Sequence, residues 1–445
     1  MRKLLLAIFV FSQLIWALDR QPNSDFRIRR QSLASKASGA AVLLFASNEA
    51  EGPNDLYGYR PDDNFFYLTG WSEPGAALLV IGTPNSGSAN SQDHPYTEIL
   101  FLPNHNPSQE KWTGPKLGAD SPDAGKITGF DHVEVLDNLQ SELVRLLPAK
   151  RATIYTDVVS GEEISNSAVP LDWLKRANAF PVGAAFQDVR PMLASLRTYK
   201  DSAEIERIRH ATDASIAAHF AAMHTVKPGI TERETSALMQ YEWGKRGCER
   251  PAYAPIVGSG FDSTVLHYSA DSGTMESGDL VVIDAAGEYS MYASDITRTL
   301  PVDGKFTARQ REIYDIVLGA QQAAAAAFRA GKSVLRRDRP ESLHDVAYNY
   351  INTHGKDLHG EPLGKYFIHG LGHYVGLNVH DPNDYDVPLG PGAVFTLEPG
   401  IYIPEEKLGV RIEDILYVNQ DGKLVNLTGN LPHTADEVEH AMAGK

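Results

Sequence analysis

The chain has 445 residues and a formal net charge of −16, with 42% hydrophobic and 22% charged residues. This length provides for two domains with large cores, and the composition is that of an ordinary globular protein. The acidic balance disfavours nucleic acid as a partner, because binding to nucleic acid rests on neutralising its phosphates. The basic run Arg336-Arg337-Asp338-Arg339 is therefore interpreted as a solvated loop rather than a nucleic-acid patch.

The first residues have the layout of a secretory signal peptide. Two basic residues precede an apolar run from Leu4 to Trp16, which is short for a membrane span, and Ala17 is a candidate end of the cleaved segment. Residues 1–17 are therefore predicted to export the protein to a periplasm or to the exterior, without stable membrane insertion. The alternative is an uncleaved membrane anchor, because Ile15 is a poor residue for the cleavage site. Cys248 is the only cysteine, which rules out an internal disulfide.

An α/β domain is predicted next, over residues 22–185. Apolar runs indicate strands, and one amphipathic run and one polar run indicate a helix and a loop. The strands are predicted at 41–45, 64–70, 76–82 and 98–103, the helix at 137–150 and the loop at 82–95. His94 and His105 are isolated in this region and are interpreted as surface histidines, so no cluster of metal ligands is predicted here.

A second pattern begins after a boundary near 185–198, and it occurs twice as helix, helix and sheet. Three of its helices open with capping boxes. The predicted helices run from Asp201 to about Met223, from Thr231 to Gly247, from Thr307 to Gly331 and over about 340–353, with strand-like segments at 253–300 and up to about 420. An internally duplicated α+β domain is therefore predicted over residues 196–437, and a site lined by both sheets would lie between the two halves.

The stretch from His369 to Asp381, HGLGHYVGLNVHD, holds three histidines and three glycines. Glycine costs about 1 kcal/mol against alanine in a helix, so a loop entering an extended segment is predicted. The alternation of apolar and polar residues in GLNVHD indicates a strand. Three imidazoles this close suggest one metal ligand together with groups that transfer protons or bind substrate; the alternative is a histidine-rich surface loop.

Four carboxylates occur in strand-like segments that lie far apart in the chain. The run LVVID ends at Asp284, and Asp295 lies eleven residues further on in ASDITRTL. If these two strands pair, both carboxylates reach one site. Glu398 follows the apolar run AVFTL, and Glu413 lies within GVRIEDILYV, which is predicted to be one alternating strand. The alternatives are turn-capping aspartates and a plain salt bridge between Glu413 and Arg411.

Carboxylates gathered in one pocket repel one another, so they need cations or raised pKa values. Two divalent ions about 3.5–4 Å apart, bridged by carboxylates, would meet that need and would activate a water molecule. Ligands that are mostly oxygen favour Mn²⁺, although Zn²⁺ or Co²⁺ can occupy such a site. The sequence therefore predicts a site for two metal ions built from distant segments.

These segments resemble those of the pita-bread metallopeptidases, which include aminopeptidase P and prolidase. The stretch HGLGHYVGLNVHD is similar to the signature of these two enzymes, and TLEPGIY, GVRIEDILYV and APIVGSGFDSTVLHY are similar to other active-site segments of the family. In the first domain, YRPDDNFFYLTGWSEPGA (59–76) resembles the creatinase-like N-terminal domain of aminopeptidase P. The resemblance covers about 55–437 and implies a pita-bread fold for the catalytic domain.

The resemblance also implies a role for each site residue. The implied metal ligands are Asp284, Asp295, His373, Glu398 and Glu413, with Asp295 and Glu413 bridging the two ions. The implied substrate-contacting and catalytic histidines are His267, His369 and His380, which act together with Glu398 in catalysis. Tyr253 and Arg411 match residues that support the metal-binding carboxylates through hydrogen bonds.

The implied activity is that of an Xaa-Pro aminopeptidase, in which a hydroxide bridging two metal ions attacks the bond before a proline in second position. The alternatives are an Xaa-Pro dipeptidase (prolidase), a metal-free creatinase-like enzyme and a catalytically silent binding module; intact ligands argue against the last two. A dipeptidase gains from an arginine that pairs the substrate carboxylate. Arg298 and Arg411 are the only arginines that the motifs tie to the site, and both are predicted to orient ligands. A homodimer or homotetramer is implied by resemblance.

Overall fold

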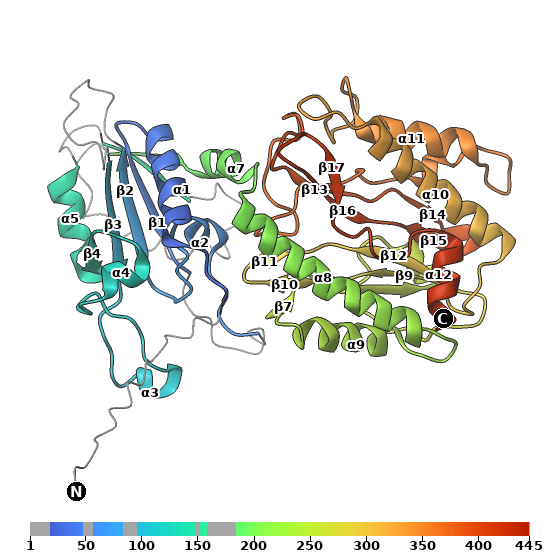
Figure 1. The fold of residues 1–445 in the computed structure, drawn as a ribbon, viewed down its shortest axis with the longest axis horizontal. Coiled ribbons are helices and arrows are strands. Elements are labelled where there is room, and N and C mark those ends of the chain that lie inside the picture. The colour runs from blue at the N-terminus through green and yellow to red at the C-terminus, as the bar shows by residue number, and fades with distance from the viewer. Residues whose placement is uncertain (1–17, 48–56, 83–95, 148–151, 158–183, 445) are drawn as a thin grey trace, which may run out of the picture.

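The computed structural model describes residues 18–47, 57–82, 96–147, 152–157 and 184–444, which form two bodies side by side (Figure 1). The predicted signal segment, His94 and nearly all of the predicted loop at 82–95 lie outside the described residues. Within the described part of the chain, no helix is both long enough and apolar enough to cross a membrane.

The N-terminal body is built on a six-stranded sheet with the strand order β4-β3-β2-β1-β5-β6. Its strands are β1 Ala41–Phe45, β2 Ala77–Gly82, β3 Tyr96–Leu102, β4 Val133–Val135, β5 Thr153–Thr156 and β6 Ala185–Asp188. Its helices are α1 Asn23–Lys36, α2 Asp63–Thr69, α3 Glu110–Thr113, α4 Ala124–Thr128, α5 Leu139–Leu146 and α7 Arg190–Arg197. Because side chains alternate along a strand, Val42 and Leu44 pack in a cluster with α1, whereas Leu43 packs on the other face with α5.

The strand prediction at 64–70 is wrong, because residues 64–69 belong to helix α2. Asp62 caps the helix by accepting a hydrogen bond of 2.8 Å from the backbone N–H of Phe65. Gly70 ends it in the left-handed conformation, with φ of 61°. The side chains from Phe65 to Thr69 are all buried, and a short continuous apolar run does not distinguish a buried strand from a buried helix. The predicted strands at 41–45, 76–82 and 98–103 are confirmed as β1, β2 and β3.

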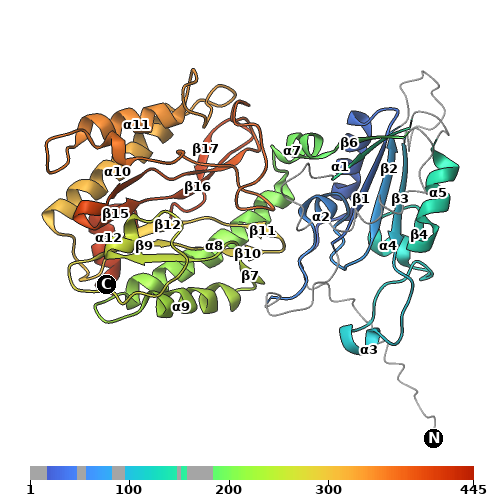
Figure 2. The same ribbon diagram turned by 180° about the vertical axis from the view of Figure 1, so that it is seen from behind.

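The C-terminal body repeats helix, helix and strands, as predicted. The first half holds α8 Ser202–Thr225, α9 Glu232–Gly244, β7 Arg250–Pro251, β8 Ile256–Ser259, β9 Leu280–Asp284, β10 Gly287–Tyr289, β11 Tyr292–Ala293 and β12 Thr297–Pro301. The second half holds α10 Ala308–Ala327, α11 Leu343–His354, β13 Val394–Leu397, β14 Gly400–Ile403, β15 Leu408–Arg411, β16 Asp414–Val418, β17 Leu424–Asn426 and α12 Ala435–Met442. Helices α8 and α9 lie along one side of the strands and α10 and α11 along the other (Figures 1 and 2).

The predicted capping boxes form at the starts of α8, α9 and α10. At each start the side chain of the capping residue and that of the residue three positions later satisfy backbone N–H groups reciprocally. Helix α10 ends at Ala327, four residues before the predicted stop at Gly331, because Phe328 is already extended. The two helix pairs and the strands between them share one large apolar core.

Two strand predictions near the candidate site are wrong. The segment GVRIEDILYV is not one strand, because β15 ends at Arg411 and β16 begins at Asp414. Strand β15 pairs with β14 and β16 pairs with β13, so the chain changes sheets at Glu413, whose N–H donates to the carbonyl of Thr297 at 3.1 Å. The segment GLNVHD also lacks a strand, since its backbone turns back through a bond from Gly376 N–H to Asn378 O.

The end of the histidine-rich segment is fixed by the N-terminal body and by the segment that joins the bodies. Asp381 is 2% exposed and pairs with Arg197 at 2.6 Å and with Lys200 at 3.0 Å. The neighbouring Asn378 accepts a bond from Arg197 and donates one of 2.6 Å to Asp63 of α2. This buried network sets the position of the segment that carries His373 and His380.

Candidate metal centre

The first two carboxylates of the site come from the antiparallel pair of β9 and β12. Asp284 is the last residue of β9 and lies opposite Thr297, the first residue of β12. Asp295 precedes β12 by two positions, so the pairing brings both acids to one end of the sheet. The predicted pairing of these strands is confirmed, and both acids are buried, at 8% and 4% exposure.

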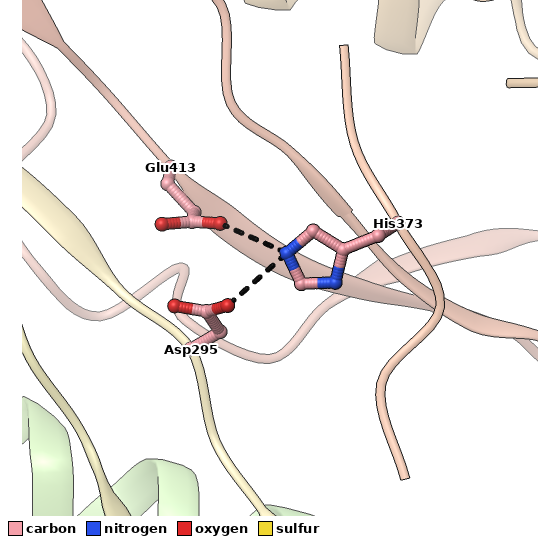
Figure 3. A group of neighbouring side chains, drawn as sticks. All are labelled: Asp295, His373 and Glu413. Atoms are coloured by element: carbon pink, nitrogen blue, oxygen red, sulfur yellow. Dashed lines mark ion pairs between the residues drawn. The ribbon is translucent and has the colours of Figure 1, made fainter. Parts of the chain in front are cut away.

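His373 faces carboxylates from both halves of the domain (Figure 3). Its Nε2 lies 3.2 Å from Asp295 Oδ2, 3.5 Å from Glu398 Oε1 and 4.0 Å from Glu413 Oε1. Its Nδ1 lies 3.2 Å from the carbonyl of Tyr374, which orients Nε2 toward the carboxylates. Ligand atoms of Asp295, His373 and Glu413 all lie within 4.8 Å of one another.

Gly372 allows the histidine-rich segment to approach strand β13 closely. A Cβ atom at this position would lie 2.0 Å from the carbonyl oxygen of Thr396, which is backbone and has little room to move. The N–H of His373 donates to Thr396 Oγ1 at 3.1 Å, and the N–H of Thr396 donates to the carbonyl of His373 at 2.9 Å. The glycine therefore permits the contact that places His373 beside Glu398.

The buried acids of the site fit a cation. Burial raises the pKa of Asp284, and burial together with the charges of neighbouring acids raises the pKa of Glu413 well above its ordinary value. Burial also raises the pKa of Glu398, to about 7. Each acid is thus costly to ionise here, and divalent cations would remove that cost. The donor set of carboxylate oxygens with one imidazole matches hard or borderline divalent ions.

Two hydrogen-bond donors hold Asp284 in place. Tyr253 Oη donates to Asp284 Oδ1 at 2.6 Å, and Arg411 Nη2 donates to Asp284 Oδ2 at 2.6 Å. Arg411 Nη1 also donates to Tyr402 Oη at 2.8 Å. The Oγ1 of Thr297 donates to Glu413 Oε2 at 2.7 Å. Partners of this kind orient metal-binding side chains. Tyr402 and Thr297 were not predicted from the sequence. The only signal for them is their even spacing from the acids, since Thr297 is two positions after Asp295 and Tyr402 is four after Glu398.

Arg298 does not orient a carboxylate of the predicted ligand set. Its Nη2 donates to Asp414 Oδ1 at 2.7 Å and its Nη1 donates to the backbone carbonyl of Glu413 at 2.7 Å. The side chain is fully buried, and Asp414 also bonds to His433 Nε2 at 2.7 Å. Arg298 therefore fixes the backbone at the junction of β15 and β16, and thereby the position from which the Glu413 side chain extends.

A cavity of about 620 Å³ opens beside the carboxylates and is lined by all ten predicted site residues. Nε2 of His369 lies 2.9 Å from Tyr402 Oη, and the ring centroid of His380 lies 4.1 Å from that of His373. Burial lowers the pKa of His369 to about 4 and also lowers that of His380. His267 lines the same cavity from an exposed position. His105, by contrast, lies in the N-terminal body with an exposed side chain, 2.9 Å from Glu110, as predicted for a surface histidine.

The affinity of the protein for Mn²⁺ is expected to rise with pH, because metal ions and protons compete for the same ligands. Although burial lowers the pKa of His373, bonding to Asp295 and the charge of Glu398 outweigh it and raise that pKa to about 9. With the pKa of Glu398 at about 7, His373 carries a proton and Glu398 is partly protonated in the metal-free protein at neutral pH. Titration calorimetry in buffers of different ionisation enthalpy should show proton release near neutrality. An affinity unchanged between about pH 6 and about pH 9 would contradict this expectation.

Comparison with known proteins agrees with this geometry. Residues 206–420 match the model of metallopeptidase family M24, and residues 26–155 match that of the aminopeptidase P N-terminal domain. The Xaa-Pro aminopeptidase of Escherichia coli is 34% identical over 94% of this chain and 97% of its own length. Human Xaa-Pro aminopeptidase 3 is 32% identical over 96% of this chain and 85% of its own length.

Solved structures give the same result. Proline aminopeptidase P II from Yersinia pestis superposes with a TM-score of 0.81 at 32% identity, over 96% of this chain and 100% of that one. Aminopeptidase P from Escherichia coli with the inhibitor Pro-Leu has a TM-score of 0.81 at 31% identity, over 96% and 99% of the chains. The chain therefore belongs to metallopeptidase family M24, among the Xaa-Pro aminopeptidases that carry an aminopeptidase P N-terminal domain.

Proposed function

We propose that the protein is a metal-dependent aminopeptidase that removes the N-terminal residue from peptides with proline in second position. The observation that carries this proposal is the convergence of Asp295, His373 and Glu413 from both halves of the domain, where burial raises the pKa of Glu413. The family of the chain agrees with it, since its full-length relatives are named Xaa-Pro aminopeptidases. The Xaa-Pro dipeptidase alternative has less support, because these relatives are named aminopeptidases and not dipeptidases.

The predicted ligands that would hold two divalent ions are Asp284, Asp295, His373, Glu398 and Glu413. When bound, such ions supply an activated water and stabilise negative charge on the carbonyl oxygen. The oxygen-rich donor set supports Mn²⁺ as the working metal. The carboxylate-rich end of the cavity attracts a free amino terminus, which supports an exopeptidase.

The side chains around the cavity are suited to proton transfer and to binding the substrate. Glu398 lies at the edge of the cavity beside His373, with its Oε1 3.5 Å from His373 Nε2, so its carboxylate can take a proton from a water molecule bound at the site. His369 and His380 are uncharged at neutral pH, because burial lowers the pKa of each, and a neutral imidazole can donate a hydrogen bond to a carbonyl oxygen. Proline after the scissile bond has no N–H, so no acceptor is needed for it in the site.

Peptides that continue beyond the proline are expected to be cut faster than dipeptides. The cavity is open and joins further space past His369, so a continuing chain can be accommodated. With Mn²⁺ supplied, kcat/KM for Ala-Pro-Ala should exceed that for Ala-Pro by at least about tenfold, equal to about 1.4 kcal/mol of differential binding. A preference for Ala-Pro would assign the protein to the dipeptidases and leave the metal-site proposal intact.

The three histidines of the segment are expected to separate into two roles. His373→Ala should lose bound metal, measured by elemental analysis, because its Nε2 faces three carboxylates. His369→Ala and His380→Ala should keep the metal yet lose about a hundredfold in kcat/KM, the size typical of an oxyanion donor or a general acid. The exposed His354 provides a control, whose alanine variant should keep both metal and activity. Loss of metal from His369→Ala with retention in His373→Ala would reverse the assignment.

A further inference from the structure

A second cavity, of about 400 Å³, adjoins the active-site cavity and shares His369, Gly370, Gly372 and Tyr385 with it. The rest of its lining comes from the segment between α10 and α11, with His344 and Ile368. Arg336 and Arg337 lie on this lining, and no acidic residue does among the residues that the structure describes. The two cavities thus carry opposite charge, with acids at one end and arginines at the other.

The segment that carries the arginines is held at its base. Val334 and Ser342 form a bridge, and the N–H of Leu343 donates to the carbonyl of Val334 at 2.9 Å. Arg336 pairs with Asp386 at 2.9 Å, which ties the segment to the loop that carries Tyr385. The closed base and this ion pair keep the arginines beside the cavity.

Arg337 differs from its neighbours because its charge is uncompensated. Arg336 and Arg339 both pair with Asp386, whereas Arg337 is exposed and makes no hydrogen bond or ion pair with any described residue. The cavity wall near it is apolar and aromatic, since His344 stacks on Phe367 at 5.0 Å between ring centroids and Ile368 is 62% exposed. Burial lowers the pKa of His344, so this imidazole adds no charge at neutral pH.

We propose that this second cavity is a subsite for residues that follow the proline, and that Arg337 binds a carboxylate of the substrate there. The inference rests on the proposed function, because it assigns a direction to the bound peptide. A short peptide carries an ammonium at its first residue and a carboxylate at its last, which matches the charges of the joined cavities. The carboxylate is either the C-terminal group or the side chain of an acidic residue, and an arginine binds both by the same bidentate chemistry.

The test compares peptides that differ only in this charge. With Mn²⁺ supplied, Ala-Pro-Ala and Ala-Pro-Ala-Ala are compared with their C-terminal amides, and Ala-Pro-Glu-amide and Ala-Pro-Ala-Glu-amide test acidic side chains at two positions. We expect kcat/KM to be about fivefold higher for a peptide with the carboxylate than for the matching peptide without it, because the carboxylate lowers KM. In Arg337→Ala this ratio of the two kcat/KM values should fall to about one. Arg337→Lys should keep part of it, and added salt should reduce it in the native enzyme.

Arg339→Ala is the matched control, because Arg339 lies in the same segment and does not line the cavity. A ratio near one in the native enzyme, or an unchanged ratio in Arg337→Ala, would overturn the inference. Binding of Pro-Ala-Ala and its amide, measured by calorimetry without turnover, separates the two proposals. A carboxylate contrast in binding that depends on Arg337, without any hydrolysis, would reject the proposed function and retain the subsite. Hydrolysis of Ala-Pro-Ala, with equal binding of Pro-Ala-Ala and its amide, would reject the subsite and retain the proposed function.

Discussion

Dialysis against a chelator is expected to reduce hydrolysis of Ala-Pro-Ala by roughly a thousandfold or more, and added Mn²⁺ to restore it. The physical reason is that Asp284, Glu398 and Glu413 lie in a buried site that raises the pKa of each, so the metal-free cluster holds protons in place of metal ions. The measurement is kcat/KM before and after dialysis, together with the metal content of the same samples.

Asp295→Asn should reproduce the effect of the chelator without one. This change keeps the size of the side chain but removes the charge 3.2 Å from His373 Nε2. We expect loss of metal and of activity, which excess Mn²⁺ restores only in part. The control is Asp279→Asn, because Asp279 lies at a turn before β9 and does not line the cavity. Full activity of a sample shown to be free of metal would contradict the two-metal proposal.

Arg298→Met is expected to lower the free energy of unfolding of the metal-free protein by about 3–5 kcal/mol. The methionine fills similar space but leaves Asp414 buried with its strongest counter-charge removed. Although burial raises the pKa of Asp414, the charge of Arg298 and the bond from His433 outweigh it and lower that pKa. For a domain of this size, each kcal/mol corresponds to roughly 2–4 °C in the melting temperature, which calorimetry can measure.

Arg311→Met is the control for that variant. Arg311 also pairs with two acids, Asp436 and Glu439, but its side chain is 34% exposed. Exposed pairs contribute at most about 1 kcal/mol, so the control should melt close to the native protein. An equal decrease in the free energy of unfolding of the two variants would show that the buried cluster around Asp414 stabilises the fold no more than a surface ion pair does.

The sequence predicted the duplicated architecture well, because its helix starts are encoded locally. Capping boxes such as Asp201 with Glu204 are formed by residues three positions apart and need no distant contact. The site was also predictable, since the segments that hold Asp284, His373 and Glu413 are recognisable by their residues. The structure brings them into one cavity, although the first and the last of them, Asp284 and Glu413, are 129 positions apart in the sequence.

The failures concern features that depend on distant partners. The run FFYL carries no polar face that would reveal a helical period, so its helix is identified only by the cap at Asp62 and by Gly70. The break before Asp414 is invisible in an alternating pattern, because alternation does not say with which sheet each half pairs. The interpretation of Arg336 and Arg337 as part of a solvated loop is confirmed, since both are exposed, but the sequence did not reveal the cavity that they line, because remote segments create it.

The buried ion pairs of Asp381 bear on how this enzyme could be shortened or recombined with its relatives. Arg197 and Lys200, its two counter-charges, precede residue 206, at which the match to the metallopeptidase family begins. A fragment cut at that boundary would retain every predicted ligand and yet bury a carboxylate without either cation. The joining segment should therefore be kept with the catalytic domain in any chimera. The bond from Asn378 to Asp63 also ties the histidine-rich segment to the N-terminal domain, so exchanging that domain would disturb the position of this segment.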